Sequence, residues 1–201
     1  MTDQTPLDPT PAPAASPPPA APAAASGPGA SMVYGDVPNR VIAYILDIVV
    51  VAIISIAVGL VLAIVGIATT SGTGLNATTN WIGSIILTIV GLAISGAYFV
   101  YSWTNQRATL GMKALGLQIG NAPDGATITR DQAIRRWLAL GAVFSIAQIL
   151  TPLPLLGLVI GLAALAWTIF LLYTTAQSPT KQGWHDVFAN TMIVKAARTV
   201  G

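Results

Sequence analysis

The sequence predicts an all-α integral membrane protein with about four transmembrane helices behind a long N-terminal tail. Only 8% of its 201 residues are charged, against about 25% in an ordinary soluble domain, and 54% are hydrophobic. Two uncharged segments, Ile48–Thr69 and Trp81–Trp103, each exceed the roughly 20 residues that cross a bilayer core. All nine basic residues also fall on one side of the resulting topology, as the positive-inside rule requires.

Residues 1–35 are predicted to form a disordered cytoplasmic tail. This stretch is rich in Ala and Pro and has too little apolar content to offset the entropy of ordering a chain. A solvated extension is the favoured interpretation, and a docking segment for a Pro-recognising partner is the alternative.

Residues 36–195 are predicted to form the membrane domain. Its helices are expected at about 38–69, 81–103, 132–150 and 155–176, with a cytoplasmic loop at 104–131. Pro152 and Pro154 divide an uncharged stretch that is too long for one span. The segment 132–150 spans fully only if Arg135 and Arg136 snorkel to the interface, and a re-entrant or shallow hairpin is the alternative.

The central loop contains two local signals. Leu115–Ile119 and Ala126–Ile128 flank a Pro-Asp-Gly sequence, which predicts a short β-hairpin. Thr129 and Gln132 have the spacing of a capping box, which predicts a helix start as the chain returns to the membrane.

The distribution of basic residues predicts the orientation. One lies at the start of the first helix, five lie between the second and third spans, and three follow the fourth: Arg40; Arg107, Lys113, Arg130, Arg135 and Arg136; Lys181, Lys195 and Arg198. The two opposite loops carry none. Both termini and the central loop are therefore expected in the cytoplasm, and the protein in the plasma membrane.

Ionisable residues within an apolar chain are candidates for function. Arg40 and Asp47 are seven residues apart on one helix face, so their levels differ by roughly 10 Å and they cannot pair directly. Asp47 lies either inside the leaflet or at the interface. A carboxylate at depth costs several kcal/mol unless it meets a polar partner or a wet cavity.

Several function classes receive no support. The chain has no Cys, all its acidic residues are Asp, and it has a single His, so neither a metal site nor a cofactor is expected. It also lacks a dense set of nucleophile, base and orienting residue, so an enzyme is not expected. The basic residues are scattered rather than clustered, which argues against nucleic-acid binding.

An ordered set of short motifs carries a resemblance. The set is Pro38-Asn39-Arg40, Asp47, Thr109-Leu-Gly-Met-Lys-Ala-Leu-Gly-Leu-Gln-Ile119, His185-Asp186 and Thr191. From about Val37 to Val194 the chain resembles the RDD family of bacterial membrane proteins, which is named after one Arg and two Asp. The resemblance implies that Arg40, Asp47 and Asp186 are the signature positions. It also implies a bacterial plasma membrane and suspected transport of unidentified ligands or ions.

Two functions are carried forward. The first is a small transporter or ion-coupled permease of an unknown ligand or ion, with Arg40, Asp47, His185 and Asp186 as pathway candidates. A homo-oligomer is expected in that case, since four helices barely enclose a path. The second is a non-transporting adaptor or scaffold with a buried Arg/Asp network. In both, the three signature charges are expected to form one cluster, and His185 is either a proton relay or a hydrogen-bonded boundary residue.

Overall fold

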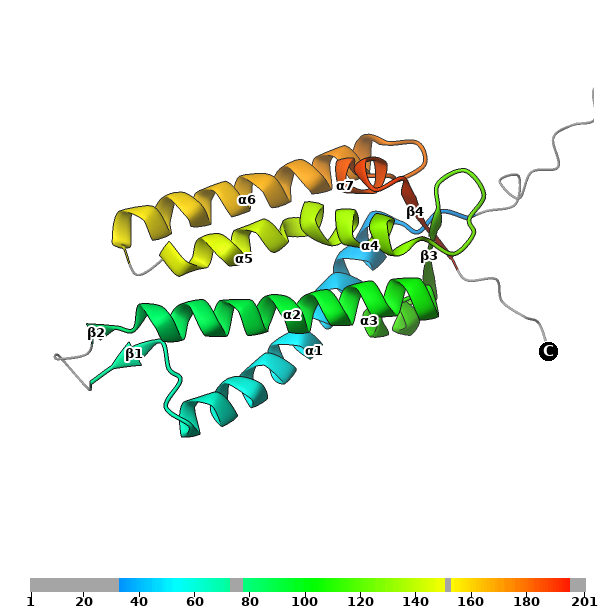
Figure 1. Cartoon of the computed structure of the whole chain (residues 1–201). Helices are drawn as coiled ribbons and strands as arrows, with labels where there is room; N and C mark the ends of the chain where they lie inside the picture. Colours follow the sequence, from blue (N-terminus) through cyan, green and yellow to red (C-terminus); the bar gives the residue numbers. More distant parts are fainter. Residues whose placement is uncertain (1–32, 73–77, 151–152, 196–201) are drawn as a thin grey trace, which may run out of the picture.

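The computed structural model describes residues 33–72, 78–150 and 153–195. They form a bundle of long helices that carries a small sheet and short helices at one end (Figure 1). Most of the predicted tail, residues 1–32, lies outside the described residues. Its last residues are not tail, because Val33 and Gly35 hydrogen-bond to the backbone near the end of the chain and Tyr34 forms a bridge with Val194.

Within the described residues, three helices are long and apolar enough to cross a membrane. They are α1 (Val37–Ile64), α2 (Trp81–Gln106) and α6 (Pro154–Gln177). The prediction for α6 was correct to within one residue at each end. The predicted end of α1 at residue 69 was wrong by five residues, because the chain leaves the helix at Gly66, whose φ is +85°. Helix α2 runs three residues beyond its predicted end.

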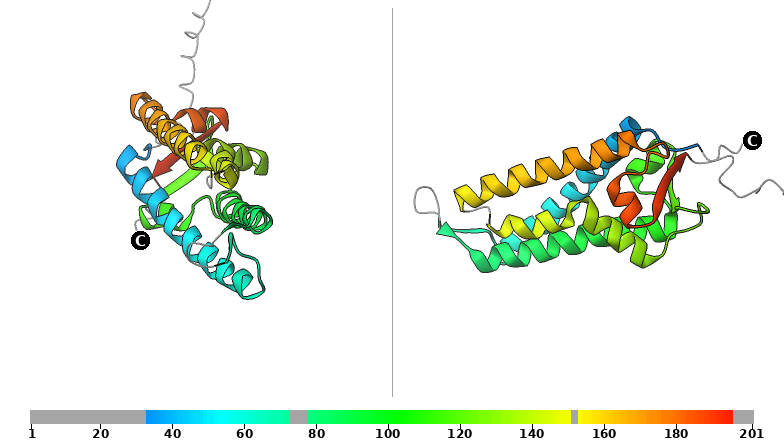
Figure 2. Two further views of the ribbon diagram at one scale, coloured as in Figure 1. Left: turned by 90° about the vertical axis from the view of Figure 1, so that its left-hand side faces the viewer. Right: turned by 90° about the horizontal axis from the view of Figure 1, so that it is seen from above.

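The predicted helix 132–150 is instead a broken segment. Helix α4 (Arg130–Trp137) is followed by a π-helical turn over 138–142, by α5 (Val143–Ala147) and by a 3-10 turn over 148–150. The break occurs at Gly141, whose φ of +124° is not helical. The predicted capping box of Thr129 and Gln132 is present at the start of α4. The broken segment lies beside α2 and α6 in all three views (Figures 1 and 2).

Two short sheets mark the two ends of the bundle. Strands β1 (Thr70–Ser71) and β2 (Thr78–Thr79) pair at one end. At the other end, which we call the polar end, β3 (Leu117–Asn121) pairs antiparallel with β4 (Thr191–Lys195). The polar end also carries α3 (Leu110–Ala114) and α7 (Trp184–Phe188).

The predicted hairpin within the central loop was wrong. Its turn forms, since the Gly125 N–H donates to the Asn121 carbonyl over 2.8 Å, but residues 126–128 do not form a strand. The partner of β3 is β4, in a register that places Ile119 opposite Ile193. Both side chains are buried, so the distant strand supplies the apolar contacts that a three-residue return strand lacks.

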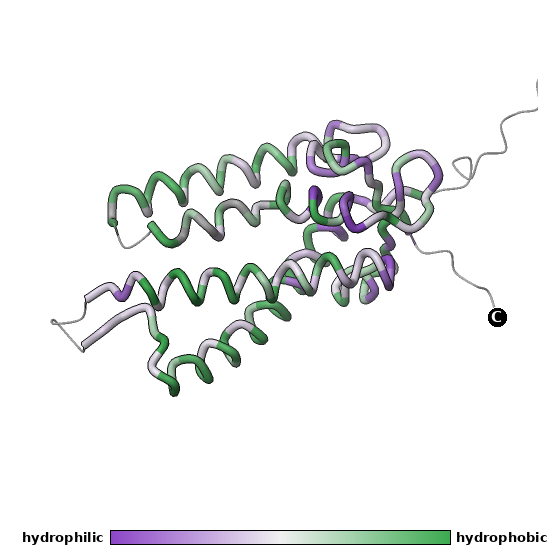
Figure 3. Tube along the Cα trace, viewed as in Figure 1, coloured by the Kyte–Doolittle hydropathy of each residue, from purple (hydrophilic) through white to green (hydrophobic). Residues whose placement is uncertain are grey.

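The buried core lies at the polar end, not along the long helices. It contains Phe99, Trp103, Met112, Leu117, Ile119, Ile128, Ala133 and Ile193. The long helices expose large apolar side chains along most of their length, as helices surrounded by lipid do. Figure 3 shows the same division, with hydrophobic colour along the helices and hydrophilic residues concentrated at the polar end.

We expect the broken segment to cross the membrane like a full helix. Cysteines introduced at Asn105 and Gln177 should then be labelled from one side of the membrane by an impermeant thiol reagent, and a cysteine at Ser71 from the other. The chain has no native Cys, so each label has one target. Labelling of Asn105→Cys and Gln177→Cys from opposite sides would mean that residues 130–150 return to the side from which they enter.

Candidate functional site: a buried arginine–aspartate cluster

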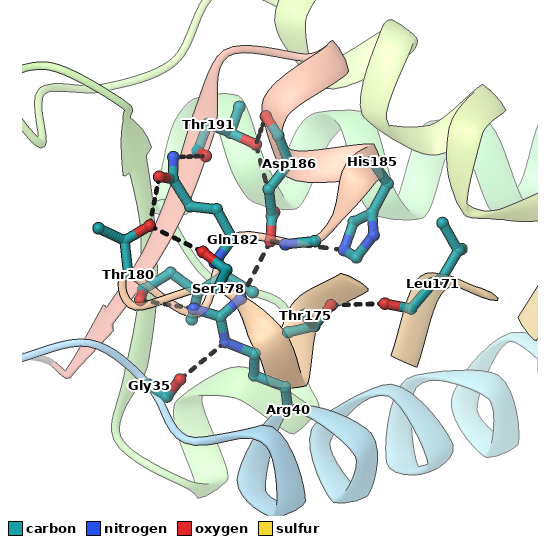
Figure 4. A network of polar contacts seen from close by, with 12 residues as sticks. Gly35, Arg40, Leu171, Thr175, Ser178, Thr180, Gln182, His185, Asp186 and Thr191 are labelled. Atoms are coloured by element: carbon teal, nitrogen blue, oxygen red, sulfur yellow. Dashed lines mark hydrogen bonds and ion pairs between the residues drawn. The ribbon is translucent and has the colours of Figure 1, made fainter. Parts of the chain in front are cut away.

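The carboxylate of Asp186 is the centre of the site. It lies at the start of α7 and is 0% exposed. One oxygen, Oδ2, accepts from the Arg40 Nη1 at 3.0 Å and from the Gly183 backbone N–H at 3.1 Å (Figure 4). The other oxygen, Oδ1, forms an ion pair with Arg136. We call Arg40, Arg136 and Asp186 the arginine–aspartate cluster.

Arg40 is held on all three of its nitrogens. Besides Asp186, its Nε donates to the Gly35 carbonyl at 2.9 Å and its Nη2 donates to the Ile193 carbonyl at 3.0 Å. One guanidinium thus joins the start of α1 to β4 and α7. The planar fork of donors on Arg suits this task, whereas the single ammonium of Lys could not reach three separated acceptors.

Arg136 is the functional residue that sequence reasoning missed. It was expected to snorkel to the interface, but it is 3% exposed and its Nη1 also donates to the Thr191 Oγ1 at 2.8 Å. Its guanidinium lies 5.4 Å from the centre of the Trp103 ring, within the range of a cation–π contact. The neighbouring Arg135 remains exposed and pairs with Asp131 one turn earlier.

A sequence signal could have separated the two arginines. Ala133, Arg136 and Trp137 occur at the spacing of one helix face, and Ala133 is fully buried. Asp131 and Arg135 have the spacing of a surface ion pair on another face. The pattern of α4 therefore places Arg136 on the apolar side, where it needs a carboxylate partner.

Asp47 does not join the cluster, and the prediction of a single cluster of three signature charges was wrong in this respect. Its carboxylate is 2% exposed and accepts from Tyr98 Oη at 2.6 Å, Thr109 Oγ1 at 2.5 Å and the Gly111 N–H at 2.8 Å. Within the described residues it forms no ion pair. Donors at the start of α3 therefore take the place that Arg40 was expected to fill.

Glycine at position 111 permits this arrangement. A Cβ on Gly111 would overlap the carbonyl oxygen of Ala43 in α1. With no side chain there, the start of α3 lies directly against α1, and the Gly111 N–H reaches Asp47. Asp47 thereby fixes the central loop to the first helix.

His185 lies beside Asp186 but is not its partner in a strong ion pair. Its Nε2 is 3.6 Å from Asp186 Oδ2, and the side chain is buried. Burial lowers the pKa of His185 well below its ordinary value of about 6.5, and the positive charges of Arg136 and Arg40 lower it further. The imidazole is therefore neutral at physiological pH. Its proposed role as a proton relay stays a prediction.

The site shows no metal-binding arrangement within the described ranges. No group of three or more His, Cys, Asp or Glu residues there is placed to hold an ion. What the site can do chemically is bind charge and hydrogen-bonding groups through guanidinium and imidazole nitrogens.

Comparison with protein families identifies the chain. The RDD family matches residues 34–190, a range that includes Asp47 and the whole arginine–aspartate cluster. The chain belongs to the RDD family. The resemblance drawn from the sequence is thereby confirmed, and this RDD protein is a multi-pass membrane protein. Comparisons with curated proteins and with solved structures give no significant match.

The geometry of the cluster predicts strong coupling between Arg40 and Asp186. Asp186→Asn should lower the free energy of unfolding by about 3–5 kcal/mol, because it leaves two buried guanidinium groups without a carboxylate. Adding Arg40→Gln should cost clearly less than the sum of the two single changes. Denaturant unfolding of the RDD protein in detergent micelles would measure this.

Asp47→Asn provides the comparison. Because Asp47 contacts other donors, its effect should add to that of Asp186→Asn within about 0.5 kcal/mol. Strong coupling of Asp47 to Asp186, or additivity of Arg40→Gln with Asp186→Asn, would contradict the geometry.

The single histidine of this RDD protein makes its protonation directly measurable. NMR of the histidine imidazole should show a neutral ring at about pH 6, where an exposed histidine is mostly protonated. Because the folded-state pKa is lower than that of the unfolded chain, the native state should lose stability as the pH falls below about 6.5. His185→Gln should weaken this loss. A histidine ring that titrates near 6.5 in the folded protein would contradict the lowered pKa of His185.

Proposed function

We propose that this RDD protein is a permease for a small solute rather than an enzyme. A series of three cavities between its helices carries the proposal, because neighbouring cavities share lining residues. The series extends from the β1–β2 end of the bundle to the arginine–aspartate cluster.

The first cavity lies toward the β1–β2 end and has a volume of about 620 Å³. Hydroxyl groups make up much of its wall: Thr69, Thr70, Thr79, Ser84, Thr88, Ser95 and Ser145. Ser84, Thr88, Ser95 and Ser145 lie on helices, and a helix surface that faced only lipid would have no need of these hydroxyl groups. They can replace part of the hydration shell of a polar solute within the bilayer.

The second cavity, of about 260 Å³, continues the first at the level of the broken segment. The two share Val51, Ser95 and Ser145. Gly141, the residue at the break, also lines the second cavity. Irregular backbone at membrane depth is tolerated where it borders a cavity, so the break has a physical reason at this position.

The third cavity, of about 420 Å³, reaches the charged residues. It shares Tyr44, Ile48, Phe99 and Leu140 with the second. Its other lining residues include Arg40, Asp47, Arg136 and His185. The proposed route therefore ends at the pathway candidates of the sequence. Its lining residues come from one chain, and the homo-oligomer stays a prediction.

We further propose that the polar end faces the cytoplasm of a bacterial cell. The described basic residues all lie there, and the β1–β2 end carries none. A solute in the third cavity would then be close to the cytoplasmic face, next to the cluster.

A specific observation also favours a second candidate, the non-transporting adaptor. Both signature carboxylates are fully engaged within the fold: Asp47 joins α1, α2 and α3, and Asp186 joins α1, α4 and α7. Residues with such partners act as structural links whether or not a solute passes. In the adaptor, the cavities would have no role and could be filled without loss of function.

Flux measurements distinguish the two candidates. In vesicles that contain the purified protein, we expect uptake of at least one probe among Na⁺, Rb⁺, Cl⁻ and glycerol above that of empty vesicles. Ser95→Leu, at the junction of the first two cavities, should lower it about tenfold or more by filling the route. Ser55→Leu makes the same chemical change on α1 outside the three cavities and should leave uptake unchanged. Absence of flux for every probe would favour the adaptor.

A further inference from the structure

The arginine–aspartate cluster has an unbalanced positive charge. It contains two guanidinium groups and one carboxylate, all more than nine-tenths buried, and His185 beside it is neutral. In the described part of the chain, Asp186 is the only carboxylate in ion-pair contact with either arginine. The charge of Asp36 also acts on Arg40, but the Asp36 side chain is 46% exposed and lies outside the cluster. An uncompensated buried charge is strongly destabilising, so the site favours an additional anion.

Two nitrogens at the cluster also lack hydrogen-bond partners. Arg136 Nε and His185 Nδ1 are buried and make no hydrogen bond within the described residues. Both residues line the third cavity and are more than nine-tenths buried. Buried polar atoms are nearly always satisfied, and a guanidinium Nε–H can only donate. The missing partner of Arg136 Nε is therefore an acceptor that the described chain does not supply.

The other carboxylate at this cavity does not contact either arginine. Asp47 lines the wall, but its oxygens accept from Tyr98, Thr109 and Gly111. Those three donors hold it toward α3. The Asp47 charge is thus stabilised by those donors, and the nitrogens of Arg136 and His185 remain without a partner.

The rest of the third cavity is apolar and reaches the outer surface of the helices. Val41, Ile45 and Ile48 of α1 line it, as do Leu171 and Leu172 of α6. Ile45 is 54% exposed and Leu172 is 41% exposed, so these walls continue into the face that contacts lipid. Figure 1 shows α1 running obliquely away from α6 beyond this point. A hydrocarbon chain could enter between the two helices.

We propose that the third cavity binds an anionic phospholipid, with its phosphate at Arg136 and an acyl chain between α1 and α6. An anionic phosphate supplies both the acceptor and the missing negative charge. A zwitterionic lipid brings its own cation and would leave the charge unbalanced, and a soluble anion would leave the apolar walls without a partner. This site does not depend on transport and would exist equally in an adaptor.

Lipid retention by the full-length protein tests the proposal. The protein is equilibrated in detergent with equal amounts of phosphatidylglycerol and phosphatidylcholine, and bound lipid is counted by native mass spectrometry. We expect about tenfold preference for phosphatidylglycerol. Arg136→Gln should abolish it, because Arg40 then balances Asp186 alone. Arg135→Gln removes a neighbouring exposed arginine and should leave the preference intact.

A second variant keeps the test decisive if Arg136→Gln does not fold. Leu172→Trp fills the apolar side of the cavity at an exposed position and leaves the cluster unchanged, and it should lower phosphatidylglycerol retention about tenfold. Leu158→Trp makes the same change elsewhere on exposed α6, outside this cavity, and should have no effect.

Three results would overturn the proposal. They are equal retention of the two lipids by the unaltered protein, an unchanged preference in folded Arg136→Gln, and an unchanged preference in Leu172→Trp. Displacement of phosphatidylglycerol by inorganic phosphate alone would assign the nitrogens to a soluble anion, and would overturn it too. None of these results bears on flux through vesicles, so the proposed permease stands or fails separately.

Discussion

The polar end depends on the ion pairs that the buried carboxylate of Asp186 forms with two arginines. Asp186 lies late in the chain, yet its carboxylate forms ion pairs with Arg40 of α1 and Arg136 of α4. Its own backbone neighbour, the Gly183 N–H, completes the set. A carboxylate in this setting is stable only because two guanidinium groups surround it, and each guanidinium is tolerated only because the carboxylate is there. The ends of α1, α4 and α7 are therefore held together by the ion pairs of this one carboxylate.

The lipid environment explains why polar residues have this task. Between helices in a membrane, lipid tails are as apolar as Leu side chains, so the hydrophobic effect does little to hold α1 against its neighbours. Buried polar contacts at one end do so instead, through the arginine–aspartate cluster and through Asp47 with α3. Beyond these contacts α1 diverges from α6, and residues of both helices line the third cavity. The hydroxyl-lined cavity and the one at Gly141 lie instead among α1, α2 and the broken segment.

The permease and the lipid site share the third cavity but depend on different features of the structure. The permease requires only that the three cavities connect, and it assigns the hydroxyl groups and the broken backbone to the passage of a solute. The lipid site requires the charge excess and the unpartnered nitrogens of Arg136 and His185. If both are correct, an anionic lipid occupies the cytoplasmic end of the route. It would then influence which solutes pass, because its headgroup would neutralise the excess charge there.

The sequence by itself determined the three long apolar helices, the capping box at Thr129 and the meeting of Arg40 with Asp186. Length, hydropathy and charge placement are local properties, and they bring both residues to one end of the bundle. Only the tertiary structure decided the partner of β3, the carboxylate that pairs with Arg136 and the separation of Asp47 from the cluster. Each of these depends on which distant segment offers the better-placed donor, acceptor or apolar surface. The two partners of each contact are 50 to 150 positions apart in the sequence, and a local sequence pattern does not indicate which distant residue will be nearest.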